Sequence, residues 1–121
     1  MTVKDFYAEI GGNYNDALQR LMNDSLIFRF IMKFPADKSF ETLKAALESK
    51  DIDAAFSAAH TLKGVCLNLA FDKLAAAAVA LTDALRPQNR ENHSLDDFGR
   101  MFAEVEKEYA AVCAALEKTT A

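Results

Sequence analysis

Apolar residues recur at helical spacing along almost the whole chain, and no stretch alternates apolar and polar residues over the length of a strand. Because residues three and four positions apart share one face of an α-helix, this pattern predicts amphipathic helices. β-Branched residues are few, and only four glycines and two prolines interrupt the 121 residues. The fold class that we predict is therefore all-α.

Three short helices are predicted at the N-terminus. The first spans Val3–Ile10 and ends at the glycine pair that follows it, and the second begins after Asn13. We expect Asp24 to cap the third, whose apolar stripe includes Phe30. Pro35 is expected to close this helix, because the residue before a proline is disfavoured in helical geometry.

Four longer helices follow, and a polar, breaker-rich loop at Pro87–His93 separates the last two. The residues expected to start the first two and the last are Asp37 or Ser39, Asp51 and Ser94, the last with Asp97 in a capping-box pattern, and Asp72 is expected to cap the third. Alanine crowds positions 54–59, 75–80 and 110–115, and such small side chains allow helices to pack closely. We predict a single domain over residues 1–121, an antiparallel four-helix bundle with additional short N-terminal helices.

Composition excludes several classes of protein. Lys and Arg are dispersed and the net charge is −4, which indicates no nucleic-acid partner. Cys66 and Cys113 lie in apolar helical context and are interpreted as core residues in a reducing compartment, with no metal site. The N-terminus lacks a signal peptide, and the longest apolar run, Leu74–Leu81, is far shorter than the roughly 20 residues of a membrane span. We expect a complete, cytoplasmic chain that contacts no membrane.

One segment stands out, His60-Thr61-Leu62-Lys63-Gly64. Ala59 and Leu62 mark the core side of its helix, so His60 is expected to point outward. The residues sharing that outward face are Asp53, Phe56, Ser57, Lys63, Gly64 and Leu67. A glycine inside a helix is about 1 kcal/mol less favourable than alanine, which suggests that another molecule approaches the backbone at Gly64. Lys63, one turn after His60, is placed to meet a negative charge carried by the imidazole.

This segment, preceded by Ala58-Ala59 and followed by Asn68-Leu69, resembles the signature of histidine-containing phosphotransfer (HPt) domains. The resemblance implies a four-helix bundle that carries a phosphoryl group on His60 and exchanges it with an aspartate of a receiver domain. It implies that Lys63 steadies the phosphoryl oxygens and that Gly64 gives the receiver room to dock.

The same resemblance names the partners, a response-regulator receiver or a hybrid histidine kinase, and we expect the chain itself to be a monomer. Such a carrier is not an enzyme with its own ATP site. It binds no cofactor of its own, because Mg²⁺ and the acceptor carboxylate are expected on the partner receiver.

Two more residues are predicted to support the phosphoryl group. If the two central helices pair across a turn centred near Phe71, His60 faces Thr82 and Arg86 lies one turn further along. HPt domains commonly place a glutamine opposite the histidine to orient the imidazole, and Thr82 or a water molecule takes that role here. Arg86 either adds positive potential near the phosphoryl group or only interacts favourably with the negative end of its own helix dipole.

Partner docking is assigned to Gly64, Phe56, Ser57 and Leu67, although the N-terminal helices are an alternative cover for Phe56 and Leu67. The alternative function is a helical docking or regulatory module that binds a receiver or kinase without carrying phosphate. A metal-binding bundle is a weaker hypothesis, because inward-facing Glu-x-x-His pairs are lacking.

Overall fold

The computed structural model describes all 121 residues and contains seven α-helices, two short 3-10 turns and no strand, which confirms the predicted all-α fold class. The N-terminal elements are α1 (Val3–Ile10), α2 (Tyr14–Leu21), α3 (Asp24–Ile31) and the first 3-10 turn, η1 (Phe34–Ala36). The remaining elements are α4 (Ser39–Glu48), α5 (Ile52–Asn68), α6 (Asp72–Leu85), the second 3-10 turn η2 (Arg90–Asn92) and α7 (Leu95–Glu117).

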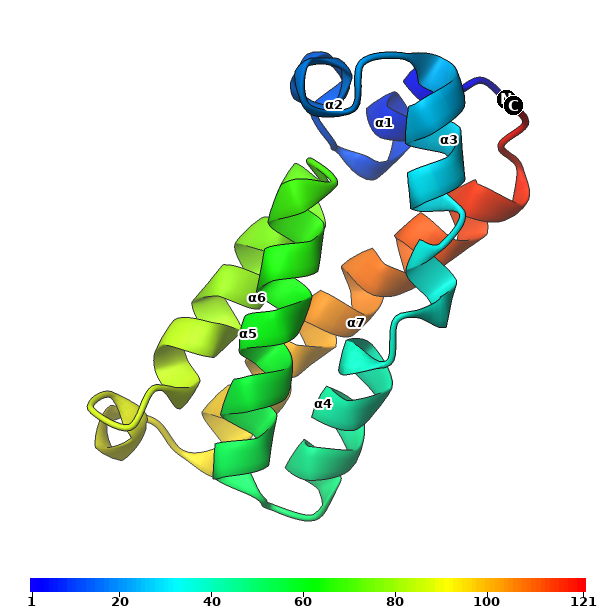
Figure 1. Cartoon of the computed structure of the whole chain (residues 1–121). Helices are drawn as coiled ribbons and strands as arrows, with labels where there is room; N and C mark the ends of the chain where they lie inside the picture. Colours follow the sequence, from blue (N-terminus) through cyan, green and yellow to red (C-terminus); the bar gives the residue numbers. More distant parts are fainter.

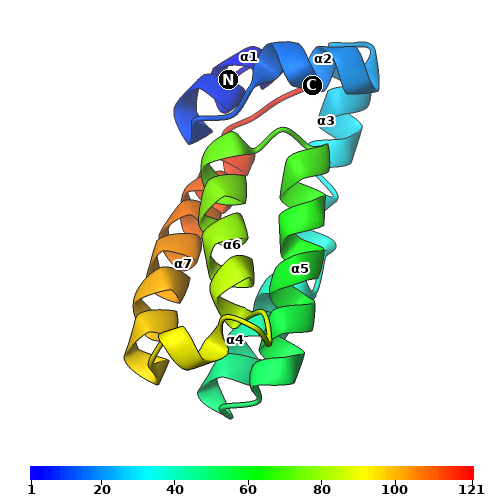
Figure 2. The same ribbon diagram turned by 90° about the vertical axis from the view of Figure 1, so that its left-hand side faces the viewer.

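The four longer helices form the predicted bundle (Figure 1). α5 packs against both α4 and α6, and α6 packs against α7. Figure 2 shows α5 beside α6, with α1 and α2 lying across one end of the bundle. None of these helices combines the length and the hydropathy that crossing a bilayer requires.

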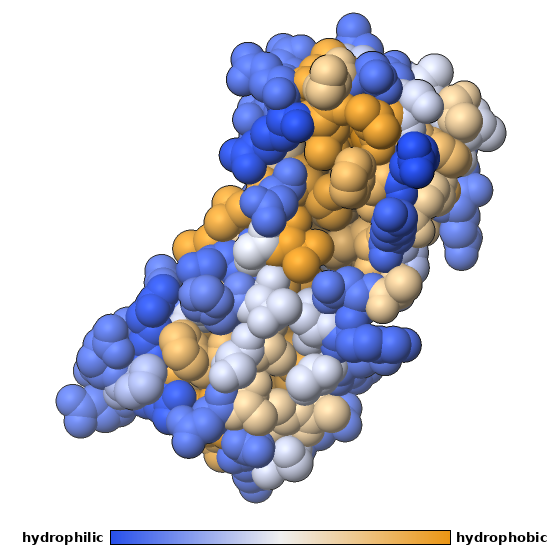
Figure 3. Space-filling model, viewed as in Figure 1, coloured by the Kyte–Doolittle hydropathy of each residue, from blue (hydrophilic) through white to orange (hydrophobic).

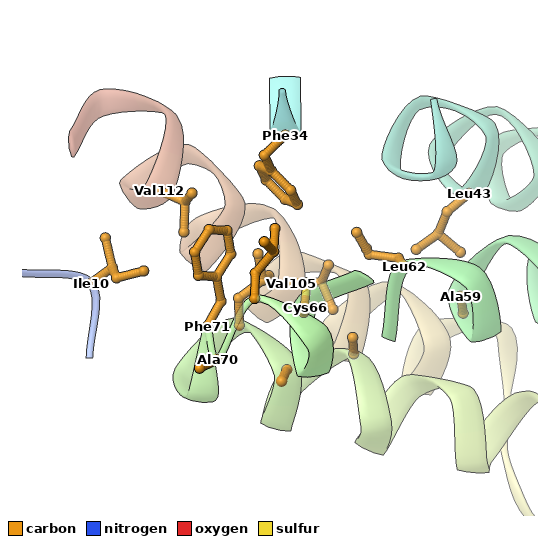
Figure 4. Packing of buried hydrophobic residues seen from close by; sticks show 14 of the residues in the cluster. Ile10, Phe34, Leu43, Ala59, Leu62, Cys66, Ala70, Phe71, Val105 and Val112 are labelled. Carbon is orange, nitrogen blue, oxygen red and sulfur yellow. The ribbon is translucent and has the colours of Figure 1, made fainter. Parts of the chain in front are cut away.

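One hydrophobic core of 29 buried residues joins the bundle to the N-terminal helices. Within the bundle, α5 contributes small side chains to it, with Ala55 and Ala59 fully buried. At the end near the N-terminal helices, large side chains fill the space, and Figure 4 shows Phe71 among Ile10, Phe34 and Val112. The end of the bundle where the N-terminal helices sit is therefore closed by bulky apolar packing.

Phe71, in the turn between α5 and α6, is the centre of an aromatic cluster. Its ring centroid lies 5.6 Å from that of Phe6, 5.9 Å from that of Tyr7 and 5.2 Å from that of Phe34. Each aromatic pair of this kind contributes about 0.5–1.5 kcal/mol beyond its buried area. The Tyr7 hydroxyl also donates a buried hydrogen bond of 2.7 Å to the Leu69 carbonyl, so α1 is attached directly to the turn that ends α5.

Two of the predicted helix caps are wrong. Asn23, not Asp24, caps α3, because its side chain accepts a hydrogen bond of 2.9 Å from the Leu26 N–H. The N-cap position of α6 is occupied by Phe71, which makes no side-chain cap, and Asp72 is the first helical residue. The buried Phe71 ring fixes the start of α6 in place of a cap. The negative charge of Asp72 interacts favourably with the positive end of the helix dipole.

The end of α3 also differs from the prediction. The helix stops at Ile31, and Pro35 lies inside the η1 turn that follows. Ile27 and Ile31 face the core, whereas Phe30 is turned away from it and is 43% exposed. The expected loop at 87–93 contains the short η2 turn.

Gly12 is required by close packing between α1 and the end of α5. A Cβ atom there would lie 2.6 Å from Cδ1 of Tyr7 and 2.9 Å from the Ala70 carbonyl oxygen. Neither atom yields easily, because one belongs to a hydrogen-bonded buried ring and the other to the backbone. We expect Gly12→Ala to lower the free energy of unfolding by about 1–3 kcal/mol, as overpacking does elsewhere.

Chemical denaturation measures this change, and Gly99→Ala is the matched control. Gly99 lies inside α7, and a methyl group added to it would meet nothing within 4 Å, so alanine there raises the free energy of unfolding by up to about 1 kcal/mol. Equal effects of the two substitutions would contradict the packing explanation.

Candidate functional site

α5 presents His60 to solvent because its opposite face is committed to the core. The helix begins at Asp51, whose side chain accepts a hydrogen bond of 3.1 Å from the Ala54 N–H. Its buried residues are Ala55, Ala58, Ala59, Leu62 and Cys66. His60 lies on the other side and is exposed, as the sequence predicts.

The imidazole of His60 makes no hydrogen bond and no ion pair, whereas Nδ1 of the other histidine, His93, lies 3.7 Å from an Asp97 carboxylate oxygen. The neighbour of the His60 ring is Phe56, one turn earlier in α5. The two ring centroids are 6.2 Å apart at an interplanar angle of 67°, an edge-to-face arrangement. Both ring nitrogens of His60 are therefore free of protein partners.

Lys63, one turn after His60, is half-buried and has no carboxylate within 4 Å. Two carboxylates near the helix face that carries His60, one on α5 and one on α6, already form ion pairs with arginines. Asp53 lies 2.6 Å from Nη1 of Arg90, and Asp83 lies 3.2 Å from Nε of Arg86. The ammonium of Lys63 is thus a cation without an anionic partner on the helix that carries His60.

Gly64 leaves open space beside this group. A Cβ atom at Gly64 would meet nothing within 4 Å, and its backbone is ordinary helix, so neither packing nor conformation inside the chain requires a glycine. Gly99 in α7 has the same open surroundings, so a helical glycine alone is not diagnostic. Gly64 differs from it by lying beside an exposed imidazole and an unpaired cation.

Thr82 is not placed at the imidazole. It has no exposed surface, and its hydroxyl donates a hydrogen bond of 2.7 Å to the Ala78 carbonyl within α6. The rotation of α6 about its own axis turns this side chain into the core. No hydrogen bond joins Thr82 to His60, so the orienting role that the sequence assigns to Thr82 has no support from this geometry.

Arg86, at the end of α6, does reach the site. Its guanidinium carbon lies 5.6 Å from the centroid of the Phe56 ring, within the range of a cation–π contact. Phe56 and Arg86 are equally distant in sequence from Phe71, so this contact agrees with the register predicted for α5 and α6. No hydrogen bond joins Arg86 to His60, and Phe56 contacts both.

The remaining predicted docking residues surround His60 to different extents. Ser57 is exposed, and Leu67 is 46% exposed, which is unusual for a leucine. Phe56 is half-buried, and the side chain over its ring comes from Arg86 and not from the N-terminal helices. Gly64, Ser57 and Leu67 therefore form an accessible surface, with Phe56 at its border.

One contact near the site was not predicted. Arg90, in the η2 turn, donates through Nη1 to Asp53 of α5 and through Nε to the Leu85 carbonyl at 2.7 Å. These bonds hold the connection between α6 and α7 against the start of α5. An arginine in a polar loop carries no sequence signal for such a contact, because its partner is 37 positions away.

Neither cysteine competes with His60 as an accessible nucleophile. Burial, with the charge of Asp37 as a smaller cause, raises the pKa of the Cys66 thiol to about 12, and burial also raises the pKa of Cys113. Both cysteines are free, but only Cys66 lies in the core; Cys113 is half-exposed, so its predicted burial is wrong. No three His, Cys, Asp or Glu side chains are arranged to hold a metal ion.

Apolar surface is concentrated elsewhere, over the end of the molecule where α3 and η1 meet α5 (Figure 3). A shallow groove there is lined by Leu21, Phe30, Lys33, Phe34, Asp37, Val65, Asn68 and Leu69. A second groove runs between the start of α4 and α5, and its lining includes Ser57 and Thr61. Neither groove contains a nucleophile of the kind that His60 provides.

Comparison with protein-family models matches the chain to the Hpt domain over residues 35–117. The match begins in η1 and covers α4 to α7, leaving α1 to α3 outside it. Curated proteins and solved structures give no match to the chain. Because the family match spans well over half of the sequence and contains the exposed histidine, this chain belongs to the Hpt domain family, the phosphocarrier modules of phosphorelays.

Proposed function

We propose that the protein carries a phosphoryl group on His60 and exchanges it with an aspartate of a receiver domain. The observation that supports this most strongly is the exposed imidazole without a protein partner, beside an unpaired Lys63 and an open Gly64. Family membership supplies the class of reaction, and these three residues supply the place where it occurs.

The transfer is a displacement at phosphorus. The unprotonated nitrogen of neutral His60 attacks the phosphorus of an aspartyl phosphate, and an N–P bond forms as the P–O bond to the aspartate breaks. The electron pair of that bond returns to the aspartate as a carboxylate. The proton on the other imidazole nitrogen remains until solvent accepts it, and the reverse sequence passes the group to the next receiver.

Lys63 stabilises the charge that this reaction brings to α5. A phosphoryl group carries up to two negative charges, and an ammonium one helical turn away meets them without first leaving a carboxylate. Arg86 adds positive charge next to the Phe56 ring. The Mg²⁺ ion and the acceptor carboxylate belong to the receiver, so this chain contributes the nucleophile and a cation.

Docking of the receiver uses the exposed surface formed by Ser57, Gly64 and Leu67, with Phe56 at its border. The absent side chain at Gly64 lets the backbone of the partner come close to α5 at the level of the imidazole. The partners that fit this surface are receiver domains, either free or attached to a hybrid histidine kinase.

The direct test incubates the protein with a panel of receiver domains carrying radiolabelled phosphate. We expect label on the wild type that is labile in acid and stable in base, as a phosphoramidate is, and none on His60→Gln. His93→Gln is the matched control and should label normally. Binding of a receiver without any transfer of label would support a docking module instead, and equal labelling of His60→Gln would refute the assignment of His60.

Gly64→Gln tests the close approach of the partner. We expect this substitution to slow transfer by roughly tenfold or more, because a side chain at Gly64 displaces the reacting groups from their productive distance. The free energy of unfolding should stay the same or rise by up to about 1 kcal/mol, since nothing in the chain opposes the new side chain. Gly99→Gln should give the same stability with unchanged transfer, and an unchanged rate for Gly64→Gln would remove the explanation.

Lys63→Ala tests the electrostatic contribution. A charge-assisted hydrogen bond to phosphate contributes about 1.5–3 kcal/mol, so we expect transfer to slow by about 10- to 100-fold without being abolished. Lys4→Ala, which removes another unpaired lysine in α1, should leave the rate unchanged. A rate equal to that of the wild type would show that Lys63 does not touch the phosphoryl group, and complete loss with an intact fold would show that it does more than stabilise charge.

A further inference from the structure

His60 lacks a polar side chain that fixes the orientation of its ring. The residue opposite it, Thr82, is fully buried, and its hydroxyl donates a hydrogen bond to the Ala78 carbonyl. Transfer of a phosphoryl group requires the attacking nitrogen to be aligned with the bond that breaks, and a misplacement of about 1 Å lowers rates by about 10²-fold. The imidazole is therefore restricted either by water or by a contact with another side chain.

Phe56 is the side chain that makes this contact. It precedes His60 by one helical turn, and side chains in an α-helix lean toward the N-terminus, so the imidazole lies over the turn that carries the phenyl ring. The centroid distance of 6.2 Å and the angle of 67° are typical of an edge-to-face aromatic pair. An apolar ring edge restricts the imidazole without donating to or accepting from either nitrogen.

Phe56 is itself held in place from α6. The Arg86 guanidinium lies over its ring at 5.6 Å, and Nε of Arg86 is bonded to Asp83 at 3.2 Å, so the arginine is anchored on its own helix. Phe56 therefore contacts Arg86 of α6 and His60 of its own helix. These two contacts and its partial burial restrict the rotation of the phenyl ring.

We propose that Phe56, held by Arg86, is a positioning residue that orients the His60 imidazole for phosphoryl transfer, an inference that rests on the function proposed above. The role is distinct from docking, since it acts through His60 and persists when no partner is bound. It also explains how the site operates with a buried threonine where an orienting polar group is expected.

The kinetic test measures the transfer rate against the concentration of a phosphorylated receiver for Phe56→Leu and Phe56→Tyr. Phe56→Leu should lower the rate at saturation by about tenfold and leave the half-saturating concentration unchanged. Phe56→Tyr keeps the aromatic ring and should retain most of the rate. Phe30→Leu is the matched control, because Phe30 is also a helical phenylalanine with a cation, the Lys33 ammonium, 5.5 Å from its ring centroid, but it does not contact His60.

If Phe56→Leu changed only the half-saturating receiver concentration and not the saturating rate, Phe56 would be assigned to docking and the proposal would be overturned. Equal loss in Phe56→Tyr and Phe56→Leu would overturn it as well, since the ring would then not matter. Denaturation curves check that each variant is folded. Arg86→Gln should shift the saturating rate in the same direction by a smaller factor, because the phenyl ring remains next to the imidazole.

A second measurement does not depend on phosphotransfer and separates the two hypotheses. In NMR spectra of the unphosphorylated protein, the ring current of Phe56 should displace the ring-proton signals of His60. Phe56→Leu should move these signals toward their positions in a free histidine and leave those of His93 unchanged. If the wild type takes no label but this shift is seen, the proposed function fails and the aromatic contact stands, whereas unmoved His60 signals would refute the contact itself.

Discussion

The rotation of α5 about its own axis is fixed by a narrow buried face, and the functional surface depends on it. Ala55, Ala59 and Cys66 have no exposed surface, and α4 and α6 pack against the two sides of the helix. Turning α5 so that His60 faced inward would replace Ala59 by a larger, polar ring. Overpacking of that kind costs about 1–3 kcal/mol before the unpaired polar nitrogens are counted. The core therefore determines that the imidazole faces solvent.

The charges around this exposed face are distributed so that one cation remains available. The chain as a whole has a net charge of −4, which by itself disfavours a phosphoryl group. Near His60, however, Asp53 is paired with Arg90 and Asp83 with Arg86, while Lys63 has no carboxylate partner. Interactions at a few ångströms outweigh the net charge, because solvent and salt screen the distant groups. An acidic protein can in this way receive an anion at one position.

Local patterns in the sequence correctly predict features that are set within a single helix. The outward position of His60, opposite the apolar stripe of α5, is one of them. The cap of α3 is missed by one residue within a local pattern, whereas the other failures involve neighbours that are distant in sequence. α6 starts after Phe71 without a side-chain cap, because aromatic rings from α1 and η1 surround that residue. The predicted register of α5 and α6 agrees with the contact between Phe56 and Arg86, but the rotation of α6 about its own axis buries Thr82. Register therefore identifies which residues lie at the level of the histidine, and the rotation of each helix decides which of them can reach it.

Gly64 and Gly99 show that a helical glycine indicates a functional site only together with its neighbours. Both lie in helix interiors, both leave open space, and both are less favourable than alanine by about 1 kcal/mol. Near Gly99, Arg100 and the imidazole of His93 both lie against the Asp97 carboxylate and so already have a partner. Beside Gly64 stand an imidazole without a partner and a lysine without a carboxylate. These two groups without partners, beside an open glycine on one helix face, fit the proposed function, in which a receiver supplies a phosphorus atom for the imidazole and negative charge for the lysine.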